Sequence, residues 1–113
     1  MDKIISLKSD TQFKKLYNKG TSSVQPSLVL YAKRNGLNCN RLGITTSKKI
    51  GNAVTRNRAR RRLREIYRAD FDVLKQGYDF VLVARVKTAN VPFFRIKEDF
   101  MRALSEVGVI RNA

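Results

Sequence analysis

The segment from Ser47 to Arg68 combines a dense positive charge with the apolar spacing of an amphipathic helix, and this restricts the fold more than any other feature of the chain. Its only acid is Glu65, against nine basic residues: Lys48, Lys49, Arg56, Arg58, Arg60, Arg61, Arg62, Arg64 and Arg68. An apolar stripe that can dock this helix on a core consists of Ala59, Leu63, Ile66, Tyr67 and, beyond the segment, Leu74.

The opposite side of this helix is expected to carry a row made by Asn57, Arg61, Arg64 and Arg68, with Arg58 beside it. Like charges four residues apart destabilise a helix by a few tenths of a kcal/mol per pair. A merely solvated charged face would normally alternate Glu with Lys, and this segment does not. The row therefore predicts a polyanionic partner.

Composition points to the same class of partner. The chain has 113 residues, which suits one domain over residues 1–113, with 42% apolar residues, a formal net charge of +15 and a pI near 10.7. Such a charge favours nucleic acid or an anionic membrane. No apolar run approaches the roughly 20 residues of a spanning helix, and Trp is absent. We expect a cytoplasmic nucleic-acid-binding domain with no membrane partner and no small-molecule substrate.

The first half of the chain predicts a helix followed by strands. A helix is expected over residues 11–19 with Asp10 as its cap, followed by a loop over residues 21–26. Residues 27–34 and 41–47 alternate as strands, each with an apolar face and a polar, partly basic face. The Asn-Gly pair in the turn between them favours antiparallel pairing of the two strands.

The second half predicts helix, strand and helix. The basic helix is expected to begin at Gly51, Asn52 or Thr55 and to end near Lys75. Residues 78–86 are apolar on both faces, as in a central strand. Pro92 suits the first turn of a last helix that ends before Gly108.

The order is helix, two or three strands, helix, strand, helix. It predicts an α/β (α+β) two-layer sandwich with a single sheet of about four strands and three helices, in the order α-β-β-β-α-β-α.

Residues for catalysis or metal binding are scarce. The chain has no His, and its nine acids are dispersed. We interpret Asp70, Asp72 and Asp79 as charge balance and turn residues, and Cys39 as a free thiol. No phosphate-binding loop or dinucleotide motif is present. We therefore expect no catalytic residue and no metal site in the protein itself.

Three aromatic residues could contact nucleic acid. Phe13 and Tyr17 fall in the first expected helix, and Tyr31 shares a strand face with Lys33. Such rings can stack on unpaired bases at about 1–3 kcal/mol each. The alternative is an ordinary core position, and Phe13 suits both interpretations equally. A ring beside a Lys on a sheet face favours contact with single-stranded nucleic acid.

These residues together resemble the protein subunit of bacterial ribonuclease P. The resemblance is carried mainly by RLGITTSKKIGNAVTRNRARRRLREIYR, Arg41 to Arg68, within which Gly-Asn-Ala-Val-x-Arg-Asn-Arg is the most specific run. FKKLYNKG from Phe13, LVLYAKRN from Leu28 and YDFVLVAR from Tyr78 support it. The similarity covers nearly the whole chain, which departs from the usual family pattern at Ala59, Arg62 and Tyr17.

The resemblance implies a fold like that of a ribosomal-protein domain, with a left-handed crossover between the parallel strands that flank the basic helix. It implies two partners, a catalytic RNA subunit and precursor tRNA, and magnesium held mainly by the RNA and its substrate. The RNA would remove the 5′ leader. The implied RNA-binding residues are Lys48, Lys49, Asn52, Arg56, Asn57, Arg58, Arg60, Arg61, Arg64 and Arg68. The implied leader-binding cleft is Phe13, Tyr17, Tyr31, Lys33, Arg41, Lys49 and Arg56.

Three other functions compete with this interpretation. A ribosomal or general RNA-binding module would suit the charge and fold equally well, and only the Gly-Asn-Ala-Val-x-Arg-Asn-Arg run discriminates against it. A protein-only nuclease is disfavoured by the absence of His. A DNA reader that places the basic helix in a major groove is possible, but an Arg-rich face with few Gln or Ser would discriminate poorly between bases.

Overall fold

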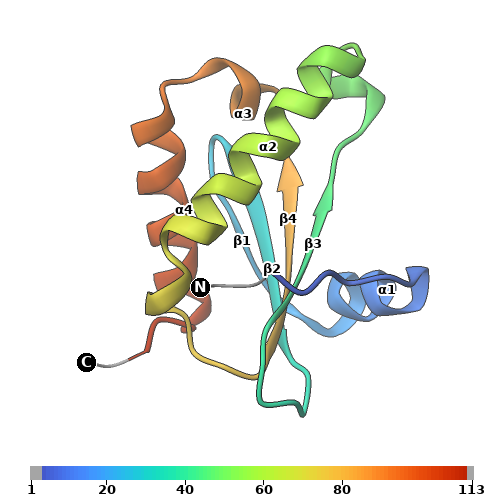
Figure 1. Cartoon of the computed structure of the whole chain (residues 1–113), viewed down its shortest axis with the longest axis vertical. Helices are drawn as coiled ribbons and strands as arrows, with labels where there is room; N and C mark the ends of the chain where they lie inside the picture. The colour runs from blue at the N-terminus through green and yellow to red at the C-terminus, as the bar shows by residue number, and fades with distance from the viewer. Residues whose placement is uncertain (1–3, 112–113) are drawn as a thin grey trace.

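A four-stranded mixed sheet with the strand order β1-β2-β4-β3 forms the centre of the molecule (Figure 1). The structure is a computed structural model that describes residues 4–111. Along the chain the elements are α1 (Asp10–Lys19), β1 (Thr21–Val24), β2 (Leu28–Arg34), β3 (Arg41–Thr45), η1 (Lys48–Ile50), α2 (Ala53–Ala69), η2 (Phe71–Val73), β4 (Tyr78–Ala84), α3 (Val86–Asn90) and α4 (Phe93–Val107), where η marks a short 3-10 helix. The expected class, α/β with one sheet, is confirmed.

The basic helix α2 connects two parallel neighbours in the sheet. β3 pairs with β4 in parallel, with Leu42 opposite Phe80 and Ile44 opposite Leu82. In Figure 1 both strands point upward, α2 lies in front of the sheet and β4 lies to the left of β3. The crossover is therefore left-handed, as the resemblance implied, whereas about 98% of such connections are right-handed.

Two expectations about the strands were wrong. β2 and β3 do not pair with each other, because β4 lies between them and pairs antiparallel with β2. β4 is apolar on both faces, so the central position buries it best. Residues 21–24, expected to be a loop, form the edge strand β1, which pairs antiparallel with β2. Its polar sequence gives no hydrophobic signal, and pairing with β2 holds it in the sheet.

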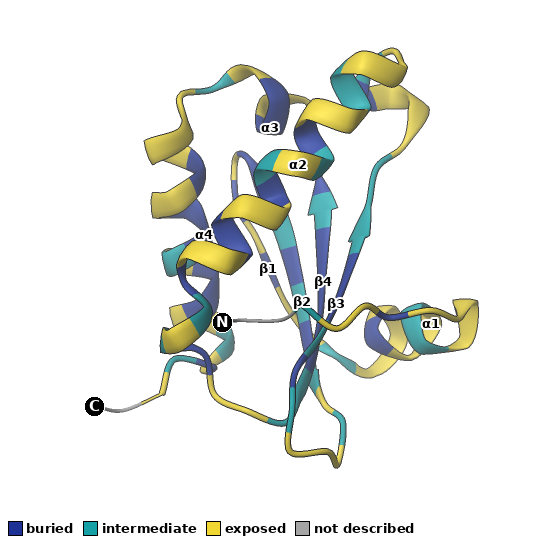
Figure 2. Ribbon diagram, in the orientation of Figure 1, coloured by how far each residue is buried: buried dark blue, intermediate teal, exposed yellow. Residues whose placement is uncertain are grey.

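The two faces of the sheet are covered unequally (Figure 2). On one face, Leu30 and Leu82 belong to the main core, which also contains the buried sides of α2 and α4. On the other face, a smaller cluster forms around Val81 with Leu16 of α1 and Leu7 of the N-terminal segment. The alternation expected for residues 27–34 is confirmed in β2, where every second residue from Leu28 to Ala32 is buried. The second face of the sheet is the more open of the two (Figure 2).

The basic helix packs as its apolar stripe predicts, since Ala59, Leu63, Ile66 and Tyr67 are all buried. Of the three possible caps, Asn52 is the one used, and its side chain accepts a hydrogen bond from the Thr55 amide at 2.9 Å. The helix ends at Ala69 rather than near Lys75. Asp70 leaves the helical conformation, and η2 then turns the chain toward β4.

Other element boundaries also differ from the expectation. Ser9 rather than Asp10 caps α1, in a capping box with Gln12. Pro92 precedes α4 instead of lying in its first turn, and the short helix α3 was not expected. Cys39 is free and half-buried. Within residues 4–111 no helix has the length and apolar character needed to cross a membrane.

Candidate nucleic-acid interface

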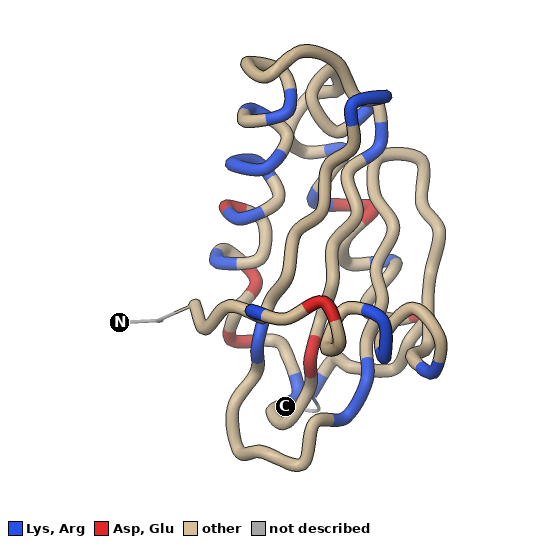
Figure 3. Tube along the Cα trace, turned by 90° about the vertical axis from the view of Figure 1, so that its right-hand side faces the viewer, with Lys and Arg blue, Asp and Glu red and all other residues tan. Residues whose placement is uncertain are grey.

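One side of α2 presents a continuous basic surface. Its exposed residues include Asn57, Arg58, Arg61, Arg64 and Arg68. In Figure 3 basic residues follow one another along the helix at the left edge of the molecule. The expected row is therefore outward-facing, while the opposite stripe is buried. We call this row of five residues the basic face.

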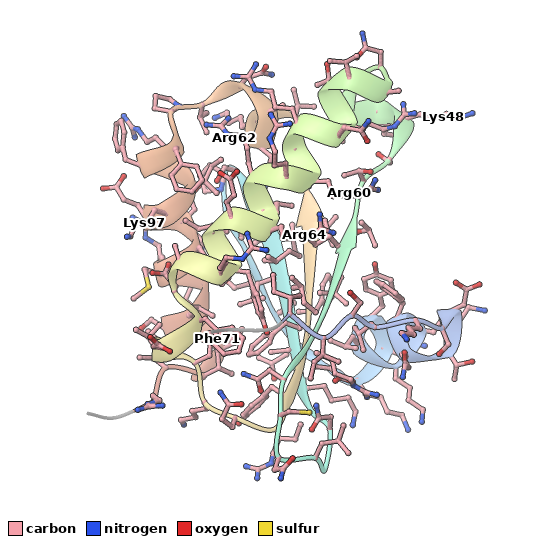
Figure 4. The ribbon with its side chains drawn as sticks, viewed as in Figure 1. Lys48, Arg60, Arg62, Arg64, Phe71 and Lys97 are labelled. Atoms are coloured by element: carbon pink, nitrogen blue, oxygen red, sulfur yellow. The ribbon has the colours of Figure 1, made fainter. Side chains whose placement is uncertain are left out.

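The flanking guanidiniums of α2 are half-buried and bonded to the protein. Arg56 donates to the Gly51 carbonyl at 2.8 Å, and Arg60 donates to Thr46 Oγ1 at 2.8 Å. In Figure 4 Arg60 and Arg64 lie on the side of α2 that faces β3. The implied RNA-binding residues thus include an exposed row, of which Arg64 also borders β3, and two side chains that bond to the chain before α2: Arg56 to Gly51 and Arg60 to Thr46.

Arg62 has a role that the sequence interpretation missed. It extends to the other side of α2, toward α3 (Figure 4), and donates to the carbonyls of Thr88 at 2.9 Å and Val91 at 2.7 Å. Burial, followed by the neighbouring charge of Arg58, lowers the pKa of Arg62. The bonded carbonyls lie at the end of α3, where a cation is electrostatically favoured. Arg62 therefore holds the α3–α4 connection against the basic helix.

The turn before α2 exposes two lysines. Lys48 and Lys49 are exposed on η1, while the next residue, Ile50, is buried in the main core and anchors the turn. Gly51 has a φ of 143°, which a residue with a side chain rarely adopts. Lys48, Lys49 and Asn52 therefore lie at the start of the basic helix, as expected.

On the more open face of the sheet, three aromatic rings gather. The ring centroids of Phe13 and Tyr17 are 6.5 Å apart, and those of Tyr17 and Tyr31 are 4.9 Å apart in an edge-to-face arrangement. Tyr17 is 41% exposed despite these contacts. A groove of about 430 Å³ is lined by Asp10, Phe13, Lys14, Tyr17 and Thr45. We call it the aromatic groove.

Gly43 lets the Phe13 ring approach the backbone of β3 closely. A Cβ at this position would meet Phe13 Cε1 and Cζ at 2.5 Å, so the ring occupies the space that any other residue would fill. Sequence reasoning did not select Gly43, because only the packing of Phe13 reveals its role.

A second, smaller cavity joins the aromatic groove to the basic helix. It has a volume of about 180 Å³ and is lined by Ile4, Ser6, Leu7, Phe13, Leu42, Gly43, Ile44, Arg60 and Arg64. Phe13 therefore contributes to both cavities, with Tyr17 on one side and two guanidiniums on the other. A nucleic-acid strand at this position could stack a base and neutralise adjacent phosphates.

The structure does not bring Lys33 and Arg41 into the aromatic groove. They line a different cavity of about 220 Å³, together with Gln12, Lys15, Leu16, Arg34, Asn35 and Asp79. Arg41 donates from Nε and Nη2 to the two carboxylate oxygens of Asp79, each at 2.7 Å. Its hydrogen bond with Asp79 raises the pKa of Arg41. Asp79, expected to be a turn residue, is therefore a strand residue that pairs with Arg41.

The described chain offers little for metal binding. Among residues 4–111 no three His, Cys, Asp or Glu side chains are grouped closely enough to hold a metal ion. Asp79 is occupied by Arg41 and by Asn35 Nδ2 at 2.9 Å.

Comparison with known proteins gives a consistent result. The model of the Ribonuclease P family matches residues 1–108. The ribonuclease P protein component of Natranaerobius thermophilus is 39% identical over 102 residues, covering 90% of this chain and 89% of that protein. The RNase P protein of Staphylococcus aureus superimposes with a TM-score of 0.83 at 29% identity, covering 96% of this chain and 100% of that one. For the Thermotoga maritima RNase P protein the TM-score is 0.77 at 30% identity, with 86% and 92% covered.

Proposed function

This chain belongs to the ribonuclease P protein family, and we propose that it binds both the catalytic RNA subunit and the 5′ leader of precursor tRNA. A ribonuclease P protein component is part of an RNA–protein endonuclease that processes tRNA. The proposal assigns the two RNA partners to two surfaces of this protein. The observation that carries it is the position of Phe13 between the aromatic groove and the guanidiniums of α2.

The basic face is proposed to bind the RNA subunit. Arg61, Arg64 and Arg68 are exposed on a rigid helix that is docked along its whole apolar stripe. Neutralising phosphates releases condensed counterions, so affinity should fall steeply with salt. Phosphate contacts of this kind position a protein on RNA without reading its sequence. Lys48, Lys49 and Asn52 at the start of the helix extend the same surface.

The aromatic groove is proposed to hold the leader, which is single-stranded and can present unstacked bases. Tyr17 and Phe13 offer ring faces, and Lys14 lies in the same groove. Stacking on aromatic rings tolerates any base, which suits leaders of varied sequence. Lys33 and Arg41, in the separate cavity beside α1, would contact the leader only if it continues past that helix.

Hydrolysis is proposed to be carried out by the RNA subunit with magnesium, which would supply the electrostatic stabilisation that phosphoryl chemistry needs. The protein's part is to bind and orient. Its exposed guanidiniums reduce the repulsion between substrate and catalytic RNA, which lets the two polyanions approach. In this division of labour no side chain of the protein acts as a general acid or base.

Two measurements test the proposal. The protein incubated with precursor tRNA and magnesium, but without the RNA subunit, should leave the substrate intact, and cleavage at the mature 5′ end would refute the division of labour. Binding of the RNA subunit should weaken with a log–log salt slope of about −0.7 to −0.9 per phosphate contacted. Arg61→Ala should make that slope shallower by roughly one contact, whereas Lys75→Gln, away from the basic face, should not.

A further inference from the structure

The connection between α3 and α4 exposes aromatic rings that the proposed function does not use. We call residues Val91, Pro92, Phe93, Phe94 and Arg95 the α3–α4 corner. Phe94 is 58% exposed and Phe93 is 36% exposed, whereas Ile96, one residue past the corner, is fully buried. Isolated exposed apolar residues are common on protein surfaces, but two adjacent exposed Phe rings are a larger patch than folding alone needs.

The corner is rigidly attached to the basic helix. Arg62 of α2 donates to the Val91 carbonyl at 2.7 Å and to the Thr88 carbonyl at 2.9 Å. Arg58 is close enough to Arg62 to lower its pKa. The corner is therefore linked to the basic face through Arg62 and its neighbour Arg58, which is a member of that face.

The charges around the corner favour an anionic partner. The guanidinium of Arg95 lies over the Phe94 ring, 5.6 Å from its centroid. Arg62 bonds to the corner, Arg58 and Glu65 are the charges that act on Arg62, and Lys97 and Glu98 follow Arg95 in α4, so basic residues outnumber acidic ones here by four to two. A purely apolar protein partner would desolvate the exposed Arg95 guanidinium without pairing it, which is costly. A nucleotide supplies both a ring for Phe94 and a phosphate for Arg95.

We propose that the α3–α4 corner is a second RNA-binding site, in which Phe94 stacks on an unpaired base of the RNA subunit while Arg95 pairs with a neighbouring phosphate. The inference rests on the proposed function, because it assigns the corner to the same RNA partner as the basic face. The leader is not the occupant, since the aromatic groove lies on the opposite face of the sheet from α4.

The test measures binding of the cognate RNA subunit to the full-length protein across a salt series. Phe94→Ala should weaken binding by roughly 5- to 150-fold, the value of one stacked base, and should leave the salt slope unchanged. Arg95→Gln should weaken binding and make the slope shallower by about one contact. Both residues are exposed, so both variants should fold, as circular dichroism can verify.

Two control variants test whether a loss of RNA affinity is specific to the α3–α4 corner. Leu37→Ala removes an exposed apolar side chain in the β2–β3 turn, and Lys75→Gln removes an exposed charge beyond α2. Neither should change the affinity. Chemical probing of the RNA subunit should show at least one unpaired base that is protected by wild type and by Leu37→Ala but not by Phe94→Ala.

The outcomes separate this inference from the proposed function. If Arg61→Ala weakens RNA binding but Phe94→Ala and Arg95→Gln bind like wild type, the corner is not an RNA site and the proposed function stands. If none of the three variants changes RNA binding, the proposed function fails as well. A concentration-dependent dimer that Phe94→Ala dissociates, with RNA affinity unchanged, would instead make the corner a contact between copies of this chain and overturn the inference.

Discussion

A side chain added at Gly43 should disturb the aromatic groove while leaving the basic face intact. A Cβ there would lie 2.5 Å from Phe13 Cε1 and Cζ and 3.2 Å from Leu7 Cδ1. Carbon atoms in contact prefer about 3.5–4.0 Å, so the Phe13 ring must move by roughly 1 Å or leave the sheet. Forcing an extra methyl group into a packed site costs about 1–3 kcal/mol of the free energy of unfolding.

The displaced ring should change leader binding specifically. If Phe13 stacks on a leader base, Gly43→Ala should weaken binding of precursor tRNA to the reconstituted enzyme by up to the value of one stacked ring, about 1–3 kcal/mol. Binding of mature tRNA, which has no leader, should be unchanged. The assay is a pair of dissociation constants, for precursor and for mature tRNA, measured with wild type and with Gly43→Ala.

A destabilised control separates stability from leader binding. Gly36 has a φ of 74°, and a Cβ added there would meet no atom within 4 Å, so Gly36→Ala costs stability through backbone strain without moving Phe13. It should bind precursor and mature tRNA as wild type does. If Gly43→Ala leaves the ratio of the precursor to the mature dissociation constant at its wild-type value, or if Gly36→Ala raises that ratio equally, Phe13 does not hold the leader.

Two further predictions concern stability. Burial raises the pKa of Asp70, the positive charge of Lys97 opposes this only partly, and Oδ2 of Asp70 has no hydrogen-bond partner among residues 4–111. Because the carboxyl pKa is higher in the folded state, the folded state loses stability as the pH rises from the ordinary Asp pKa to the raised one. Asp70→Asn should therefore raise Tm at pH 7, and should raise it by less at pH 4. Equal shifts at both pH values would show that the charge is not responsible. Arg62→Met keeps the aliphatic stem but loses the hydrogen bonds to Thr88 and Val91, so it should lower the free energy of unfolding by about 1–2 kcal/mol. Arg61 is exposed, so Arg61→Met should change that free energy by less than about 0.5 kcal/mol. Urea unfolding measures both.

The parts of the fold that periodicity could predict are those where one residue type repeats on one face. The stripe that includes Ala59 and Leu63 correctly predicted the buried side of α2, and the two-sided apolar run around Val81 correctly predicted a central strand. The order of strands in the sheet was not predictable in this way. The Asn35–Gly36 pair is compatible with a hairpin, but β4 lies between β2 and β3 in the sheet, and only long-range burial decides this.

The candidate site was predictable to a similar extent. Charge density identified the basic face. Alternation separated Tyr31 from the strand face of Leu28 and Leu30, and the structure places Phe13 on the side of Tyr31. Helical phase placed Arg61 in the outward row and left Arg62 out of it, but no pattern in a single sequence could show that Arg62 bonds to Thr88 and Val91, because the fold brings those carbonyls near. Asp79 was misjudged for the same reason, since its partner Arg41 lies on a neighbouring strand 38 residues away.

The central claim is that the RNA subunit and the leader bind to different surfaces of the protein. The most direct test measures three dissociation constants for wild type, Arg61→Ala and Tyr17→Ala: protein for RNA subunit, reconstituted enzyme for precursor tRNA, and reconstituted enzyme for mature tRNA. Arg61→Ala should weaken only binding of the protein to the RNA subunit. Its two tRNA constants should match wild type when they are measured with enough protein to saturate the RNA subunit. Tyr17→Ala should weaken only the second, by about 1–3 kcal/mol. If Tyr17→Ala weakens binding of precursor and mature tRNA equally, or if both variants weaken the same constant, the two surfaces are not functionally separate and the account is wrong.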